Sequence, residues 1–198
     1  LLGGSVLFSM YHWMPETRPV QAERRSMLSS FYLLLSNSTF SAFLIMLICA
    51  LSGIAVFEAS SGVLMGGVLG LNSITISILF ILPIPAAFFG AWYAGREGKT
   101  FVQLMWHSVF CCVAAGILMW LPGWLNIINI WTLLVPAALF FFGAGMLFPL
   151  ATTGAMEPFP YLAGAAGALV GGLQNVGSGI ATWFSALLPQ HNQFSLGM

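Results

Sequence analysis

The sequence predicts an all-α integral membrane protein, and its composition and the length of its apolar runs both point there. Of the 198 residues, 59% are apolar and only 5% are charged, whereas a soluble domain carries about 25% charged residues. The apolar residues form runs of about 20, the length that a helix needs to cross a hydrocarbon core of about 30 Å. Such runs are too long for barrel strands and do not alternate. This composition excludes nucleic-acid binding, a disulfide-bonded secreted scaffold and a disordered chain.

The first element is an apolar stretch, residues 1–13, which is shorter than the roughly 17–25 residues of a full span. We expect it to be the end of a transmembrane helix, and the chain to be a fragment of a longer polytopic protein. Residues 14–39 follow and are predicted to form a cytoplasmic loop between two helical bundles. Five charged side chains lie in this loop: Glu16, Arg18, Glu23, Arg24 and Arg25.

Five full transmembrane helices are predicted between residues 40 and 187, each long enough to cross the membrane. They cover about 40–60, 73–94, 101–120, 130–151 and 164–187. Glycine and proline mark the joints between them, at 66–67, 95–98, 121–123 and 157–160. Residues 188–198 are expected to form an outer loop and the start of a missing final helix.

Two of the predicted helices carry residues that affect their shape or packing. In the span 73–94, Pro83 and Pro85 each remove a backbone donor, so a kink is expected there. The span 164–187 begins with small residues spaced by four, among them Gly167 and Gly171. Such stripes allow close approach of helix backbones, so we interpret this one as a packing surface.

The basic residues predict how the chain is oriented in the membrane. Three arginines lie in the loop 14–39, and Arg96 and Lys99 lie between the spans 73–94 and 101–120. The loops of the opposite side, 61–72, 121–129 and 188–195, contain no lysine or arginine. Because basic residues accumulate in cytoplasmic loops, the Arg- and Lys-bearing loops are predicted to be cytoplasmic.

Glu58 is the one carboxylate inside a predicted span. An ionisable group at membrane depth is costly, and it usually faces a cavity, a partner or the interface. Two interpretations stay open: Glu58 lies near the outer end of its helix and reaches the interface, or it carries a proton or cation.

A metal site and catalysis are weakly supported by the sequence. His107 and Cys111 share a helix face, with Cys112 beside them, but two ligands do not make a site. The rival hypothesis of an intramembrane enzyme or metal protein rests on these residues alone. We therefore expect no metal, no cofactor and no enzymatic activity.

Bulky apolar side chains provide candidates for the wall of a binding cavity. Phe80 and Ile84 lie one turn apart on a predicted helix and face either such a cavity or lipid. Trp131 lies at the outer end of the span 130–151, where it either anchors the helix at the interface or closes a pocket for a lipophilic cation.

Several segments resemble the Bcr/CflA-type drug:proton antiporters of the major facilitator superfamily. They are residues 13–19 (WMPETRP), 81–90 (ILPIPAAFFG), 134–149 (LVPAALFFFGAGMLFP) and 157–160 (EPFP). The resemblance covers essentially the whole chain and implies a C-terminal helical bundle, from the end of helix six through helices seven to eleven. One departure is the segment 95–99 (GREGK), where Gly95 stands in place of the aspartate of the family's charged loop signature.

The resemblance implies half of a multidrug efflux transporter of the bacterial inner membrane. Lipophilic drug-like compounds would leave in exchange for protons by alternating access, together with the missing N-terminal bundle. On this basis Ile48, Phe80, Ile84 and Trp131 are the expected substrate-binding residues, and Glu58 is the candidate for proton coupling. A major facilitator carrier of another small solute and a non-transporting membrane fragment remain as alternatives.

Overall fold

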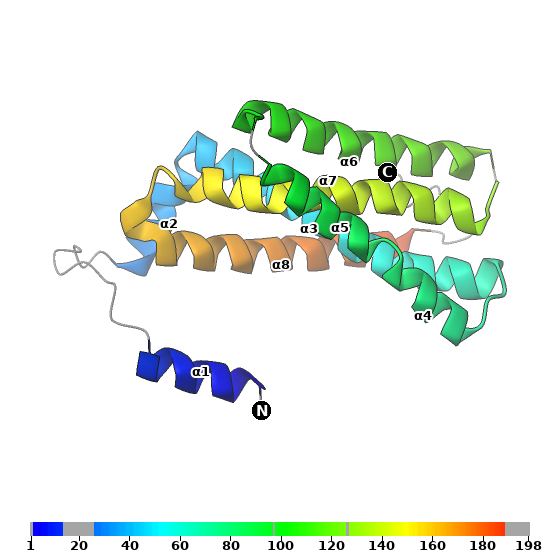
Figure 1. The fold of residues 1–198 in the computed structure, drawn as a ribbon, viewed down its shortest axis with the longest axis horizontal. Coiled ribbons are helices and arrows are strands. Elements are labelled where there is room, and N and C mark those ends of the chain that lie inside the picture. Colours follow the sequence, from blue (N-terminus) through cyan, green and yellow to red (C-terminus); the bar gives the residue numbers. More distant parts are fainter. Residues whose placement is uncertain (1, 14–25, 97, 126, 189–198) are drawn as a thin grey trace.

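The computed structural model describes residues 2–13, 26–96, 98–125 and 127–188, and in these residues helices and turns are the only structure present. The order is α1 (Leu2–Trp13), α2 (Met27–Leu35), α3 (Ser38–Val63), α4 (Ser73–Ile81), α5 (Ile84–Ala94), α6 (Phe101–Trp124), α7 (Ile130–Met156) and α8 (Ala163–Leu187), with short π- and 3-10-helical turns at Leu64–Val68 and Pro160–Leu162. Figure 1 shows α3, α6, α7 and α8 running lengthwise side by side, with α4 and α5 across them. The predicted all-α fold is confirmed.

Among the described residues, four helical segments are long and apolar enough to cross a membrane: Ser38–Val68, Ser73–Ala94, Phe101–Trp124 and Ile130–Met156. They overlap four of the five predicted spans, and the first runs to Val68, through the joint predicted at 66–67. The fifth, α8, has 25 residues and is therefore long enough, but it is not among the four. Its membrane crossing stays a prediction.

The region predicted as the loop 14–39 contains a helix, α2, which corrects that expectation for its second half. Ser26 caps α2 by accepting a hydrogen bond from the backbone N–H of Ser29 at 3.2 Å. Leu34 is completely buried and joins the core formed with α3, α7 and α8. The earlier charged residues of this loop, up to residue 25, lie outside the described residues, as does the predicted outer segment beyond residue 188.

The kink predicted in the span 73–94 is confirmed as a break between α4 and α5. The helical pattern is interrupted at Leu82 and Pro83, where Pro83 has no N–H to donate. A prolyl residue does not always end a helix in this chain. Pro122 was expected to lie in a joint, but α6 continues through it to Trp124, because a membrane helix tolerates proline when neighbouring groups satisfy the freed carbonyls.

Helix α7 lies at the centre of the bundle and packs against α3, α5 and α6. Its glycines allow this contact. A Cβ added at Gly145 would lie 2.8 Å from the backbone carbonyl carbon of Ala87 on α5, and one added at Gly90 of α5 would lie 3.0 Å from that of Phe142 on α7. On another face of α7, a Cβ at Gly143 would lie 2.7 Å from the sulfur of Cys112 on α6. Close backbone packing of this kind is how membrane helices associate without a hydrophobic driving force.

The small-residue stripe of α8 is largely uncovered in this chain. A Cβ added at Gly171 or Gly172 would meet nothing within 4 Å, and one at Gly167 would make an ordinary 3.6 Å contact with Met156. Helix α8 instead packs on α3 through a different glycine, Gly177, whose added Cβ would lie 2.5 Å from Cγ2 of Ile48. Among the described helices, the predicted packing role of the stripe is therefore met only at Gly167, beside Met156 of α7.

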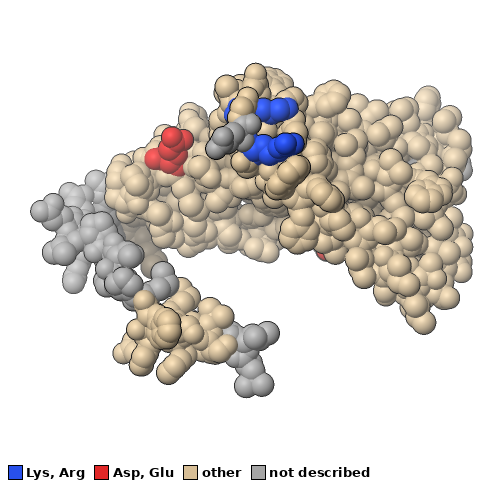
Figure 2. Space-filling model, viewed as in Figure 1, with Lys and Arg blue, Asp and Glu red and all other residues tan. Residues whose placement is uncertain are grey.

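Charged side chains are confined to small parts of the described surface. Figure 2 shows the Lys and Arg atoms gathered over the joint between α5 and α6, with almost all of the remaining described surface on that face uncharged. The two residues are Arg96 and Lys99, and Glu157 lies at the C-terminal end of α7. The uncharged flank is the surface that a bilayer requires.

Candidate functional site

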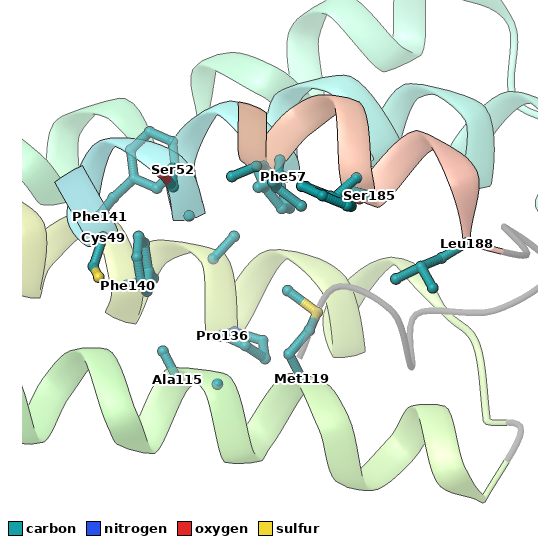
Figure 3. Close-up of a pocket in the computed structure, with 16 residues that line it drawn as sticks. Cys49, Ser52, Phe57, Ala115, Met119, Pro136, Phe140, Phe141, Ser185 and Leu188 are labelled. Atoms are coloured by element: carbon teal, nitrogen blue, oxygen red, sulfur yellow. The ribbon is translucent and has the colours of Figure 1, made fainter. Parts of the chain in front are cut away.

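A cavity of about 510 Å³ lies between α3, α6, α7 and α8, and it is the best candidate for a binding site among the described residues. Figure 3 shows α6 residues facing α7 residues across part of it. Sixteen side chains or backbones line it: Cys49, Ser52, Gly53, Val56, Phe57, Ala115, Gly116, Met119, Pro136, Ala137, Phe140, Phe141, Ala181, Phe184, Ser185 and Leu188. Its size falls within the 300–1,000 Å³ typical of small-molecule pockets.

Small residues from three helices border the cavity and leave space there. They are Ala115 and Gly116 on α6, Ala137 on α7 and Ser52 on α3. The neighbouring Gly53 does not add space, because the ring of Phe140 occupies the position where its Cβ would be. The space therefore lies beside Ser52, Ala115 and Ala137, whereas the ring of Phe140 fills the position next to Gly53.

The chemistry of the cavity is that of an apolar binding surface. No Asp, Glu, Lys, Arg or His side chain is among the described residues that line it. Its polar groups are the hydroxyls of Ser52 and Ser185 and the thiol of Cys49. The Ser185 hydroxyl shares a buried hydrogen bond of 3.2 Å with the hydroxyl of Ser60. Such a surface can hold a lipophilic molecule or an apolar side chain.

None of the five residues expected at the functional site lines this cavity. Ile48 is half-buried and packs into the α3–α8 contact at Gly177. Phe80 is also half-buried, and its ring meets that of Phe57 edge to face with centroids 6.3 Å apart. Because Phe57 itself lines the cavity, Phe80 supports the wall from behind.

The other three expected residues lie on the outside of this bundle. Ile84 is exposed at the start of α5, and Glu58 is exposed on α3 about one turn before its end. Trp131 is 69% exposed at the start of α7, two residues after Asn129, whose side chain caps that helix. Any ligand that these three residues share must therefore approach the bundle from outside.

The second sequence hypothesis concerned a metal site around His107. The structure brings no group of three or more His, Cys, Asp or Glu side chains together among the described residues. The ring of His107 instead lies 6.2 Å from that of Tyr93, edge to face. Cys112 is occupied in the α6–α7 contact at Gly143.

Sequence reasoning missed the cavity because it searched for bulky side chains. The residues that create the space are small, and the relevant pattern is Cys49, Ser52, Gly53 and Val56, which share one face of α3. A search for small residues at helical spacing on several spans would have found this face. It would also have found the packing glycines of α7, so the pattern alone does not separate a cavity from a close contact.

Comparison with known proteins decides which family the chain resembles. Over all 198 residues, the chain is 68% identical to Multidrug resistance protein D of Escherichia coli (strain K12). The predicted resemblance to the major facilitator drug antiporters is confirmed. The chain spans 50% of that relative's length. No family model matches the chain, and no solved structure matches it. With its four membrane-capable helices, the chain is a multi-pass protein of the inner membrane.

Proposed function

We propose that this chain forms one half of a multidrug efflux transporter, which exports lipophilic compounds across the inner membrane by proton-coupled alternating access. The observation that carries the proposal is the 68% identity along the whole chain to a multidrug resistance protein. The described structure supports it through the largely uncharged surface of the helices and the apolar cavity between them. We expect no enzymatic activity.

Alternating access requires each bundle to move as a unit. The glycine contacts of α7 with α5 and α6 join these helices at backbone distance, and the contact at Gly177 joins α3 to α8. Such contacts make the bundle stiff, because closely packed backbones resist sliding. The uncovered stripe on α8, which includes Gly171 and Gly172, provides a surface against which the other bundle would rock.

We place the end of the bundle that carries Arg96, Lys99 and Glu157 on the cytoplasmic side. The two described cations lie together at the joint of α5 and α6 (Figure 2). No described residue of the joints between α3 and α4 or between α6 and α7 is basic. This asymmetry supports the orientation, since basic loops stay in the cytoplasm.

The proposed substrate contacts are Phe80, Ile84 and Trp131, with Ile48 as the fourth, and Glu58 is the proposed proton carrier. Exposure of Ile84 and Trp131 in this half leaves their side chains accessible to a molecule held between two bundles. Glu58 is exposed too, so its carboxylate is accessible to water or to a group on the other bundle. Ile48 is the weakest of the four, because its side chain already packs against α8.

A chimera tests the proposal. The half of Multidrug resistance protein D that this chain matches is replaced by the chain, and the chimera is produced in a strain with low background efflux. We expect it to lower the accumulation of a lipophilic dye and to raise the tolerated concentration of the dye. A chimera that reaches the membrane in normal amount but leaves dye accumulation unchanged would contradict the proposal.

Transport of a small polar solute separates the proposed drug transporter from its main rival, a carrier of another small solute. A carrier of another solute would bind its cargo through buried polar or charged groups, and the described cavity has serine and cysteine as its only polar side chains. We therefore expect the chimera to transport lipophilic dyes and to leave the uptake and loss of labelled sugars unchanged.

A further inference from the structure

The outer face of α5 carries an apolar groove, separate from the cavity described above. Four residues line it: Pro85, Phe88, Phe89 and Trp92. The three aromatic side chains are mostly exposed, Phe88 by 72%, Phe89 by 63% and Trp92 by 61%. From Pro85 to Trp92 the groove follows α5 for about 10 Å, at 1.5 Å per residue. Its length and apolar lining suit a segment of hydrocarbon chain.

Two neighbouring cations near the C-terminal end of α5 each lie over an aromatic ring (Figure 2). The guanidinium carbon of Arg96 lies 4.7 Å from the centroid of the Trp92 ring, and that ring also lines the groove. The Lys99 ammonium lies 4.5 Å from the centroid of the Tyr93 ring and donates a hydrogen bond to the Tyr93 hydroxyl. Both cations are exposed, so each retains a face for an anion.

The first turn of α6 adds a third electropositive group. Helix α6 begins at Phe101, two residues after Lys99, and Thr100 caps it through a capping box with Gln103. The amino end of a 24-residue helix carries a partial positive charge that attracts anions. The adjoining ends of α5 and α6 therefore present an electropositive surface next to Trp92, which lines the groove.

We propose that the groove and the two cations form a binding site for one anionic phospholipid. The lipid phosphate would lie between Arg96 and Lys99, and an acyl chain would lie along Phe88, Phe89 and Trp92. Charge complementarity selects an anionic headgroup, and Trp92 connects the two parts because it contacts the cation and lines the groove. Basic residues next to a membrane helix attract anionic lipids in this way.

The two cations give the proposal a direct check. The attraction of a phosphate to this surface comes from the charges of Arg96 and Lys99, so neutralising both should weaken anionic lipid binding.

Quenching of Trp92 fluorescence by brominated lipids tests the site. The full chain is reconstituted in phosphatidylcholine vesicles that contain increasing amounts of brominated phosphatidylglycerol or brominated phosphatidylcholine. The Trp92 signal is the difference between the chain and Trp92→Phe. Trp106 on α6 is 70% exposed and provides the matched control, measured with Trp106→Phe. For Trp92, we expect the lipid fraction that gives half-maximal quenching to be lower for brominated phosphatidylglycerol than for brominated phosphatidylcholine, by roughly 5-fold for each cation. For Trp106, the two lipids should quench equally.

The variants decide the result. Arg96→Gln with Lys99→Gln should abolish the preference at Trp92, with unchanged helical circular dichroism. Equal quenching of Trp92 by the two lipids, or a preference that survives the double substitution, would overturn the proposal. The same measurement on the chimera detects another occupant: if neither lipid quenches Trp92 there, the second bundle covers the groove and the proposal is wrong.

Discussion

The contact between α5 and α7 gives the sharpest prediction about the stability of this bundle. At the crossing, Gly90 and Gly145 each face backbone atoms of the other helix. A methyl group at Gly145 would lie 2.8 Å from the Cα and carbonyl carbon of Ala87, and one at Gly90 would lie 3.1 Å from the backbone nitrogen of Met146. Because the obstructing atoms are backbone, no rotamer change relieves the overlap, and the helices must separate.

The expected magnitude follows from two opposing terms. Overpacking of a close-packed interior costs about 1–3 kcal/mol, and replacing glycine by alanine in a helix returns about 0.5–1 kcal/mol. Because the obstructing atoms are backbone, the overpacking cost lies in the upper part of its range, at about 2–3 kcal/mol, so Gly90→Ala and Gly145→Ala should each lower the free energy of unfolding by about 1–2.5 kcal/mol. For a chain of this size that corresponds to a fall in Tm of roughly 2–10 °C.

Thermal unfolding of the purified chain in detergent micelles, followed by circular dichroism, measures this effect. Gly172→Ala is the matched control, since a Cβ at that position on α8 meets nothing within 4 Å. We expect its Tm to stay unchanged or to rise. If Gly90→Ala and Gly145→Ala behave like Gly172→Ala, then the α5–α7 backbone contact is not a determinant of stability and the reasoning fails.

Three further predictions concern the cavity, its hydrogen bond and the carboxylate. Ser52→Phe places a ring in the cavity and should reduce binding of a lipophilic dye to the chain about tenfold, while the control Ala59→Phe, on the exposed side of α3, should leave dye binding unchanged. Equal dye binding by both variants would show that dye does not occupy the cavity. Ser185→Ala removes the 3.2 Å hydrogen bond to Ser60 and should cost about 0.6 kcal/mol in thermal unfolding, and a rise in Tm would speak against its stabilising role. Glu58→Gln in the chimera should remove the dependence of dye efflux on a pH gradient, and an unaltered dependence would assign proton coupling elsewhere.

Hydropathy and breaker residues predicted much of this fold from the sequence. The all-α class follows from apolar runs that only helices can place in a bilayer, and the break at Pro83 follows from a missing donor. Helix ends were less predictable: α6 passes Pro122, and α2 forms where polar composition suggested a loop. Both outcomes depend on tertiary contacts, such as the burial of Leu34, which no local pattern reports.

The site was harder to predict than the fold for a physical reason. A cavity is a shortage of side-chain volume where several helices meet, and its position depends on which faces oppose one another. The sequence shows that Ser52, Ala115 and Ala137 are small, but it does not show that they lie around one space. Bulky residues such as Trp131 attract attention in a sequence, and here that side chain lies outside the bundle.

Transport by the purified chimera tests the central claim most directly. The chimera is reconstituted in sealed vesicles, a pH gradient is imposed across the membrane, and the movement of a lipophilic dye is followed over time. The account predicts dye movement against its concentration gradient that requires the pH gradient and stops when a protonophore collapses it. Dye movement at the rate of protein-free vesicles, from a chimera that is folded and inserted, would contradict the account.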